Sequence, residues 1–309
     1  MINYFKIILC NLLWILKLTE NAFRESKVHG KLNFPFTVYH VKMPDFITSY
    51  PLHYHEVFEL IFVTRGALRV RIMDKEEILY QDDMAVILPD NAHLLSMASK
   101  DTFTEYFNIV FDFSLLKGAP LFDEIYDSYL SKLANHSREI DCFLKKNTPL
   151  QRTLYNPVNE LVIHRHESYT SRQMLVLGQV FLIADAIYRF SREVNPDVGS
   201  YADTFTLIRK ALYFVEIMYG KSIQVRDAAE YCGYSESHFM KLFKESTGQS
   251  FNEYLVSYRM MIAQKCLGTT DDRIIDIAFD CGFSDAAYFA TAFKKFCGMT
   301  PLQYRKSKK

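Results

Sequence analysis

The chain has 309 residues with 36 basic and 36 acidic side chains, and 49% of its residues are hydrophobic and 15% aromatic. This length and composition supply ample core for two domains of ordinary size, and the neutral balance excludes a chain that attracts its partners through net charge alone. The six cysteines form no Cys-x-x-Cys pair, so we expect no disulfides and a reducing, cytoplasmic location.

Residues 1–32 are predicted to form an N-terminal helix or extension. Residues 7–16 are apolar and are flanked by Lys6 and Lys17, but such a segment is too short for a bilayer, which takes about 20 residues. No small-residue cleavage site follows it. We expect either a helix that packs on the next domain or a start codon further along the chain, and no membrane partner.

Residues 33–114 are predicted to form a β-domain. Several segments rich in β-branched and aromatic residues follow one another closely, and turns with Gly or Asp separate several of them. Closely spaced short strands are typical of a sandwich or a small barrel. The predicted strands are residues 34–42, 57–63, 67–73, 77–80, 84–88 and 103–111.

A histidine motif lies inside this β-domain. It runs His53-Tyr-His55, then Glu59 and Gly66, and is followed later by His93. Residues i and i+2 of a strand point to the same face, so His53 and His55 can converge inside a barrel. Imidazole and carboxylate together suit Fe, Zn, Mn or Ni.

The motif resembles that of the cupin barrel. The resemblance implies that His53, His55, Glu59 and His93 are the matching residues of metal-binding cupins, although Asp83 and Asn91 stand where Gly is usual. We expect these four residues to line an effector pocket at the barrel mouth, with no metal and no cofactor. Metal coordination by the same four residues is the alternative.

Three arginines, Arg65, Arg69 and Arg71, follow the motif. They could meet an anionic effector or form the outward face of a strand, and we favour the outward face. Residues 115–200 are predicted to be a helical region and linker, because 154–166 and 174–190 carry apolar stripes. The turn-forming residues 195–200 mark the domain boundary.

The C-terminal part of the chain contains one pattern twice, in residues 229–254 and 278–304. Four residues of the first copy recur 49 positions later and five recur 50 positions later. We place the one extra residue inside the second helix of the later copy. A period of this size indicates a structural unit that is used twice.

Each unit is predicted to be a helix, a tight turn and a helix. Gly233 ends the first helix, Ser235 caps the next one, and Phe239, Leu242 and Phe243 form a buried stripe. This layout is that of a helix-turn-helix, whose second helix can enter a DNA major groove. The second unit repeats the pattern with Gly282, Ser284, Asp285, Phe289 and Phe293.

A helix predicted over residues 251–267 joins the two units. At 1.5 Å per residue it is about 24 Å long, a rigid spacer that could hold two recognition helices on one face of DNA. Successive major grooves on one face lie about 34 Å apart. One chain could therefore contact two grooves.

Over roughly residues 206–305 the chain resembles the AraC/XylS family of bacterial transcription regulators. The resemblance implies a DNA-binding domain over 201–309, a dimer contact through the helix after the barrel, and more often an activator than a repressor. Residues 201–309 hold 15 Lys and Arg against 12 Asp and Glu, a weak basic bias that suits binding as a homodimer. The matching residues are Ala229, Gly233–Ser235, Phe243–Lys244, Gly248, Tyr258–Arg259, Ala263, Leu267, Ile277–Ala278, Gly282–Phe283, Tyr288–Phe289, Phe293–Lys295, Gly298, Pro301 and Tyr304–Arg305.

The resemblance also indicates which residues face DNA. In the first unit Lys241 can donate to guanine or to a phosphate. In the second unit Thr291 stands where the family more often has Arg or Lys, so shape fit and phosphate contacts through Lys294 and Lys295 are expected. The predicted DNA-binding set is Ser237, His238, Met240, Lys241, Lys244, Ala286, Ala287, Ala290, Thr291, Lys294 and Lys295.

The predicted fold class is multidomain α+β. It comprises a cupin-like β-barrel (33–114), a helical dimerisation region and linker (115–200), and an all-α domain with two helix-turn-helix units (201–309). The predicted function is transcription regulation, and not enzymatic, with double-stranded DNA, a small-molecule effector such as a sugar, a second copy of the chain and RNA polymerase as partners. The alternative is a metal-dependent cupin enzyme with a fused helical domain.

Overall fold

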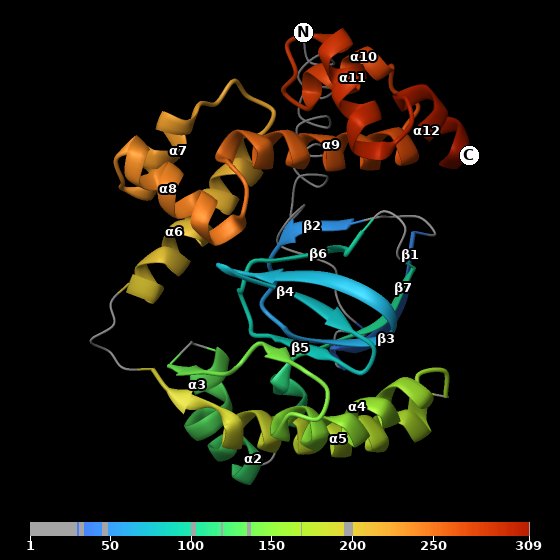
Figure 1. Cartoon of the computed structure of the whole chain (residues 1–309), viewed down its shortest axis with the longest axis vertical. Helices are drawn as coiled ribbons and strands as arrows, with labels where there is room; N and C mark the ends of the chain where they lie inside the picture. The colour runs from blue at the N-terminus through green and yellow to red at the C-terminus, as the bar shows by residue number, and fades with distance from the viewer. Residues whose placement is uncertain are drawn as a thin grey trace, which may run out of the picture. The chain divides into compact units, whose positions relative to one another are not determined.

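The computed structural model describes residues 30, 34–44, 49–99, 103–118, 120–134, 137–167, 169–194 and 200–308. The chain divides into two compact parts at residues 201 and 202. We call residues 27–201 the N-terminal domain and residues 202–309 the C-terminal domain, and Figure 1 shows strands packed with helices in the first and helices in the second. The extension predicted for residues 1–32 lies outside the described residues, apart from Gly30.

The N-terminal domain is built on an antiparallel sheet in which the long strand β3 pairs with four other strands (Figure 1). The first half of β3 pairs with β7 and β5, and its second half pairs with β4 and β6. The strands of this sheet are β1 Phe36–Met43, β2 Ser49–His53, β3 Phe58–Ile72, β4 Lys75–Tyr80, β5 Met84–Ile87, β6 His93–Met97, β7 Thr104–Phe111 and β9 Phe143–Leu144.

Two of the strand predictions were wrong. The segments predicted at 57–63 and 67–73 form one strand, because Gly66 adopts a left-handed φ of 79° and lets the strand continue past an irregularity at Val63/Arg65. A Cβ on Gly66 would lie 1.7 Å from the carbonyl oxygen of Phe103. Strands β2 and β6 were not predicted at all, and each contributes a histidine of the motif.

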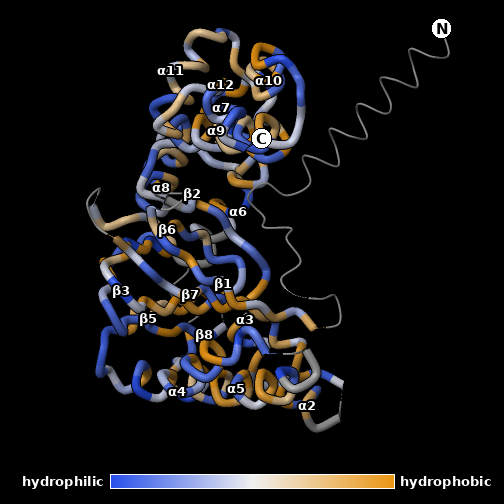
Figure 2. Tube along the Cα trace, turned by 90° about the vertical axis from the view of Figure 1, so that its right-hand side faces the viewer, coloured by the Kyte–Doolittle hydropathy of each residue, from blue (hydrophilic) through white to orange (hydrophobic). Residues whose placement is uncertain are grey.

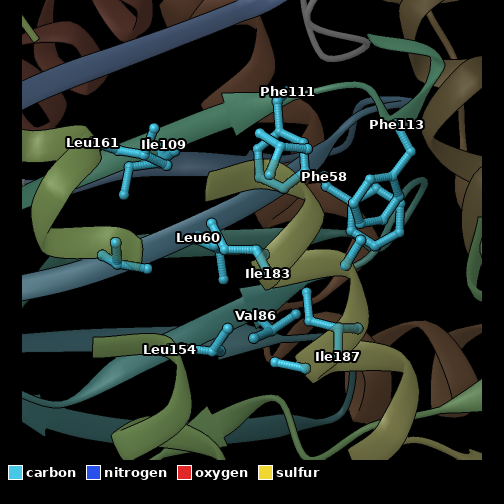
Figure 3. Close-up of a cluster of buried hydrophobic side chains, with 14 of the residues drawn as sticks. Phe58, Leu60, Val86, Ile109, Phe111, Phe113, Leu154, Leu161, Ile183 and Ile187 are labelled. Atoms are coloured by element: carbon cyan, nitrogen blue, oxygen red, sulfur yellow. The ribbon is translucent and has the colours of Figure 1, made fainter. Parts of the chain in front are cut away.

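Two helices cover one face of the sheet and create the core of this domain (Figure 3). Along β3, Phe58 and Leu60 point toward α4 Pro149–Ile163 and α5 Tyr169–Phe190, while the residue between them, Glu59, points away from them. By length and composition alone, Arg172–Phe190 in α5 could span a membrane, but six of its apolar residues are buried in this core. They are Val176, Val180, Ile183, Ala184, Ala186 and Ile187.

Short elements complete the domain. They are η1 Phe113–Leu116, α2 Pro120–Ile125, η2 Tyr126–Leu130, α3 Ser131–Ala134, β8 Arg138–Glu139 and β10 Arg192–Glu193. Figure 2 shows hydrophobic residues along α5 and the neighbouring α2.

The C-terminal domain consists of helices. The first helix-turn-helix unit is formed by α7 and α8, the second by α10 and α11, and α9 joins them. The helices are α6 Ser200–Met218, α7 Val225–Cys232, α8 Glu236–Thr247, α9 Phe251–Thr269, α10 Ile274–Asp280, α11 Ala286–Cys297 and α12 Pro301–Lys308.

The extra residue of the second unit lies in its turn and not inside its second helix, as the sequence analysis had placed it. Helices α8 and α11 both have 12 residues. The N-cap of α11 is Asp285 rather than Ser284, because the Asp285 carboxylate accepts hydrogen bonds from the amides of Ala287 and Tyr288. Ser235 is the N-cap of α8 as predicted, although its side chain makes no capping hydrogen bond.

Candidate functional site

Helix α8 has one buried face and one exposed face. Phe239 and Phe243 are fully buried, while Met240 is 43% exposed. This division follows from the i, i+4 spacing of the two phenylalanines, which turns the intervening residues outward. The predicted DNA-facing residues Ser237, His238, Met240, Lys241 and Lys244 all lie on the exposed face.

Helix α11 has the same division but a different chemistry. Phe289 and Phe293 are fully buried. The exposed face carries methyl groups and two charges, and the hydroxyl of Thr291 already donates to the carbonyl of Ala287 at 3.0 Å. Ala287, Thr291, Lys294 and Lys295 are exposed, and Ala286 and Ala290 are half-buried.

A surface groove of about 550 Å³ runs along this face of α11. Its lining joins two lysines to Thr300, the residue before α12. Two ammonium groups beside an open groove suit the phosphates of a nucleic acid backbone. The lining residues are Ala290, Thr291, Lys294, Lys295 and Thr300.

The second candidate site is the buried histidine cluster of the N-terminal domain, which brings together all four predicted residues. His53, His55, Glu59 and His93 are 5%, 2%, 1% and 0% exposed. One ligand atom from each lies within 4.8 Å of those of the others. The ring of His93 is 4.0 Å from that of His53 and 5.0 Å from that of His55, so the side chains contact one another directly.

The prediction that His53 and His55 occupy one strand is only partly right. Strand β2 ends at His53, and His55 lies in the segment that follows. Convergence comes instead from the pairing of β2 with β6, which puts His53 opposite His93. Glu59 arrives from β3, on the face that does not meet the helices.

Backbone carbonyls fix the tautomers of two of these histidines. The Nδ1 atom of His55 lies 3.0 Å from the carbonyl oxygen of Val57, and Nδ1 of His93 lies 2.8 Å from that of Asn91. A carbonyl can only accept, so each Nδ1 carries the proton and each Nε2 of a neutral ring is a lone pair. The two carbonyls were not predicted as parts of the site, because a sequence pattern does not show where a main-chain oxygen points.

Both Nε2 atoms face Glu59. The Oε2 atom of Glu59 is 2.5 Å from Nε2 of His55 and 3.1 Å from Nε2 of His93, and the latter contact lacks hydrogen-bond geometry. Burial raises the pKa of Glu59, but His93 and His55 outweigh it and hold the pKa well below its usual range. Its other oxygen, Oε1, is buried without a hydrogen-bond partner among the described residues. A carboxylate that faces two ring nitrogens requires a cation between them, either a proton on the imidazole or a metal ion.

Arg69 and Arg71 alternate with the buried Leu68, Val70 and Ile72, which agrees with the outward strand face that was favoured, although Nη1 of Arg71 is itself buried. Arg69 and Arg71 bind the Glu76 carboxylate on β4 at 2.8 Å and 3.3 Å. Arg65 lies over the ring of Phe103. Asp83, which stands where Gly was expected, accepts from the amides of Tyr80 and Lys146 and so ties the β4–β5 turn to the segment before α4.

The chain thus joins a domain built on an antiparallel sheet to a domain with two helix-turn-helix units. The comparisons agree. Residues 36–174 match an AraC-like ligand binding domain, and residues 228–307 match a helix-turn-helix domain. The chain belongs to the AraC-type family, and the similar proteins named below are transcriptional regulators.

Among similar proteins is an uncharacterized HTH-type transcriptional regulator of Staphylococcus aureus (strain COL), 42% identical over half of this chain. The match spans only 20% of that protein's length. The Msm operon regulatory protein of Streptococcus mutans is 30% identical over 62% of this chain and 63% of its own length. Among solved structures, ToxT from Vibrio cholerae with a bound unsaturated fatty acid is 16% identical over 87% of this chain and 94% of its own, with a TM-score of 0.44.

Proposed function

We propose that this protein is a cytoplasmic, sequence-specific DNA-binding transcriptional regulator, an activator controlled by a small molecule. The observation that carries the proposal is the pair of helices α8 and α11, each with a fully buried phenylalanine stripe and an exposed face. Two such helices in one domain provide two elements that can enter major grooves. RNA polymerase is the further partner that an activator requires.

The two helix-turn-helix units contribute different kinds of contact to DNA recognition. The exposed face of α8 carries a hydroxyl, an imidazole and two ammonium groups, and Lys241 supplies the donor best suited to a guanine edge. The face of α11 offers methyl groups beside a lysine-lined groove. The first unit therefore supplies most polar base contacts, and the second supplies shape fit and phosphate contacts.

A salt titration of the whole protein on duplex DNA tests the proposal. Neutralised phosphates release counterions, so the logarithm of the association constant falls with the logarithm of the salt concentration at about 0.9 per phosphate contacted. We expect a linear dependence and a residual preference for one sequence at physiological salt. Absence of any salt-dependent binding to duplex DNA would overturn the proposal.

The N-terminal domain is the effector-binding part in this proposal, with a sugar as the class that the family resemblance implies. The effector must bind two states of the protein with different affinity. Only that difference can shift the protein toward the state in which the C-terminal domain binds DNA. The buried histidine cluster is the polar centre around which such a site would form.

A divalent metal is a second candidate for this cluster, contrary to the expectation of no metal. The fixed Nδ1 tautomers aim the Nε2 lone pairs of His55 and His93 at an ionised, incompletely satisfied carboxylate. Ligating histidines commonly donate their other nitrogen to a backbone carbonyl, as both do here. Because the rings contact one another directly, the space among them suits an ion, and a sugar would have to bind beside the cluster rather than among its side chains. Imidazole and carboxylate ligands favour Fe, Zn, Mn or Ni.

Thermal unfolding with and without metal tests this candidate. We expect one of these ions at 100 times its dissociation constant to stabilise the N-terminal domain by about 2.7 kcal/mol, or roughly 5–10 °C. Glu59→Gln removes the negative ligand and should abolish the shift. His164→Gln is the control, since His164 contacts Glu160 and Glu167 in a separate half-exposed group. Equal shifts for the wild type and Glu59→Gln, or no shift for any ion, would rule the metal out.

A homodimer through α5 is also part of the proposal. The apolar residues of α5 that lie in the domain's own core, Val176 and Ile183 among them, are unavailable for a dimer contact. Met174 and Leu182, at 77% and 53% exposure, form an apolar line with Gly178 between them. This line is the part of α5 on which a second copy could pack.

Replacing Leu182 by Glu places a charge on this line, and we expect it to convert a dimer to a monomer with little change in folding. Sedimentation at several protein concentrations measures the result. Tyr80→Glu is the matched control, because Tyr80 is 58% exposed on β4, away from α5. A Leu182→Glu protein that dimerises as tightly as the wild type would exclude this surface.

A further inference from the structure

Helix α6 contacts both helix-turn-helix units of the C-terminal domain. Along its length it meets the first unit: the carbonyl of Leu207 accepts from the thiol of Cys232, and the ring of Phe214 lies 5.1 Å from that of Tyr231. At its C-terminal end it meets the second unit, where the backbone of Tyr219 and Gly220 reaches the turn between α10 and α11. One helix thus spans the pair.

Arg259, on the connecting helix α9, contacts both the segment after α6 and the turn of the second unit. Its Nε donates to the carbonyl of Tyr219 at 2.9 Å, and its Nη2 donates to the carbonyl of Lys221 at 2.8 Å. These two carbonyls lie just past the C-terminal end of α6, which is the negative end of the helix dipole and so favours a cation nearby. The guanidinium also lies over the ring of Phe283 in the turn of the second unit, 5.6 Å from the ring centroid.

The two turn glycines show that this contact belongs to the second unit alone. Gly233 is the C-cap of α7 and Gly282 follows Cys281, the C-cap of α10, with φ of 84° and 81°. A Cβ on Gly282 would lie 2.3 Å from the carbonyl oxygen of Tyr219 and 2.8 Å from Nη2 of Arg259. A Cβ on Gly233 would meet nothing within 4 Å. A side chain at Gly233 would therefore meet open space, whereas one at Gly282 would collide with the Tyr219 carbonyl and with Arg259.

We infer that Arg259 is a positioning residue that fixes the second recognition helix relative to the first, and so sets the spacing of the two DNA elements that the protein prefers. The inference rests on the proposed function of binding DNA through both units. Arg259 is not expected to contact DNA, because its guanidinium already donates to the carbonyls of Tyr219 and Lys221 and lies over the ring of Phe283. Lysine cannot replace it fully, because an ammonium group lacks the planar fork that donates to two carbonyls and lies flat on a ring.

The test compares Arg259→Met with Lys265→Met, which removes an exposed charge from the same helix. Each protein is titrated on duplexes with both elements at the preferred spacing, with one base pair added or removed, and with a single element. Tethered elements gain affinity only while geometry permits both to bind, so Arg259→Met should lose about 10- to 100-fold on the preferred duplex. Its affinity for a single element should stay within about twofold of the wild type, and its spacing preference should flatten. Retention of the wild-type spacing preference, or equal losses on single and paired elements, would overturn the inference.

A measurement without DNA separates this inference from the proposed function. Spin labels on non-natural residues at Glu245 of α8 and Lys295 of α11 report the distance between the two recognition helices. We expect one narrow distribution for the wild type and Lys265→Met, a broader one for Arg259→Met, and partial recovery for Arg259→Lys. Gly282→Ala should broaden it and Gly233→Ala should not. Superimposable distributions would overturn the inference even if DNA binds, and failure of the wild type to bind DNA would contradict only the proposed function.

Discussion

Replacing Phe243 by Ala is expected to lower the local free energy of unfolding of the first helix-turn-helix unit by about 3–5 kcal/mol, the usual effect of removing a buried phenylalanine ring. Phe243 is fully buried, and its ring lies 5.6 Å from Phe239, 5.7 Å from Phe251 and 5.6 Å from Tyr254. The cavity would therefore open between α8 and α9, at the contact that orients the recognition helix. Hydrogen exchange of the α8 and α9 amides measures the loss.

The internal repeat supplies a comparison for this variant. Phe293 is the counterpart in the second unit, fully buried between Phe289 at 5.7 Å and Tyr304 at 5.6 Å. Phe293→Ala should destabilise α11 and leave α8 protected. Phe296→Ala, 38% exposed on α11, should change stability by no more than about 0.5 kcal/mol. Unchanged exchange of α8 amides in Phe243→Ala would show that its ring does not hold the unit together.

Replacing Lys241 by Ala should weaken binding to the preferred DNA by about 1–3 kcal/mol and relax the sequence preference at one position, since a lysine that donates to a guanine edge discriminates between bases. Lys241 is exposed in the second turn of α8, one residue after Met240. Binding to the preferred site and to single-base variants measures both effects.

The lysines of the second unit should behave differently. Lys294→Ala and Lys295→Ala remove groups that line the groove beside α11. We expect each to weaken binding nearly equally for all sequences and to reduce the salt dependence by about one phosphate contact. If Lys241→Ala leaves affinity and sequence preference unchanged, Lys241 does not contact a base and the proposed division between the units is wrong.

The repeat made the C-terminal domain predictable, because turn glycines and phenylalanine stripes are local signals. The extra residue was misplaced because Ser284 and Asp285 are both competent N-caps, and helices α6 and α12, which lie outside the repeat, were not predicted. Asp285 prevails because its carboxylate accepts from two amides. Periodicity could not distinguish the two.

The N-terminal site was less predictable, although its four residues were identified. Strands β2 and β6 are short, and β2 contains Pro51, so neither shows clear alternation. The carbonyls that fix the histidine tautomers and the contact of Arg259 with Tyr219 are set by tertiary packing. The last joins residues 40 positions apart, a separation at which a sequence pattern carries no information about contact.

The central claim is that one chain reads DNA through both helix-turn-helix units. Selection of bound sites from a random-sequence duplex pool tests it most directly. We expect the recovered sites to contain, for each chain, two elements about one helical turn apart, roughly 10 base pairs, with the sharper preference in the element bound by α8. Recovery of a single element per chain, or of no sequence preference, would contradict the claim.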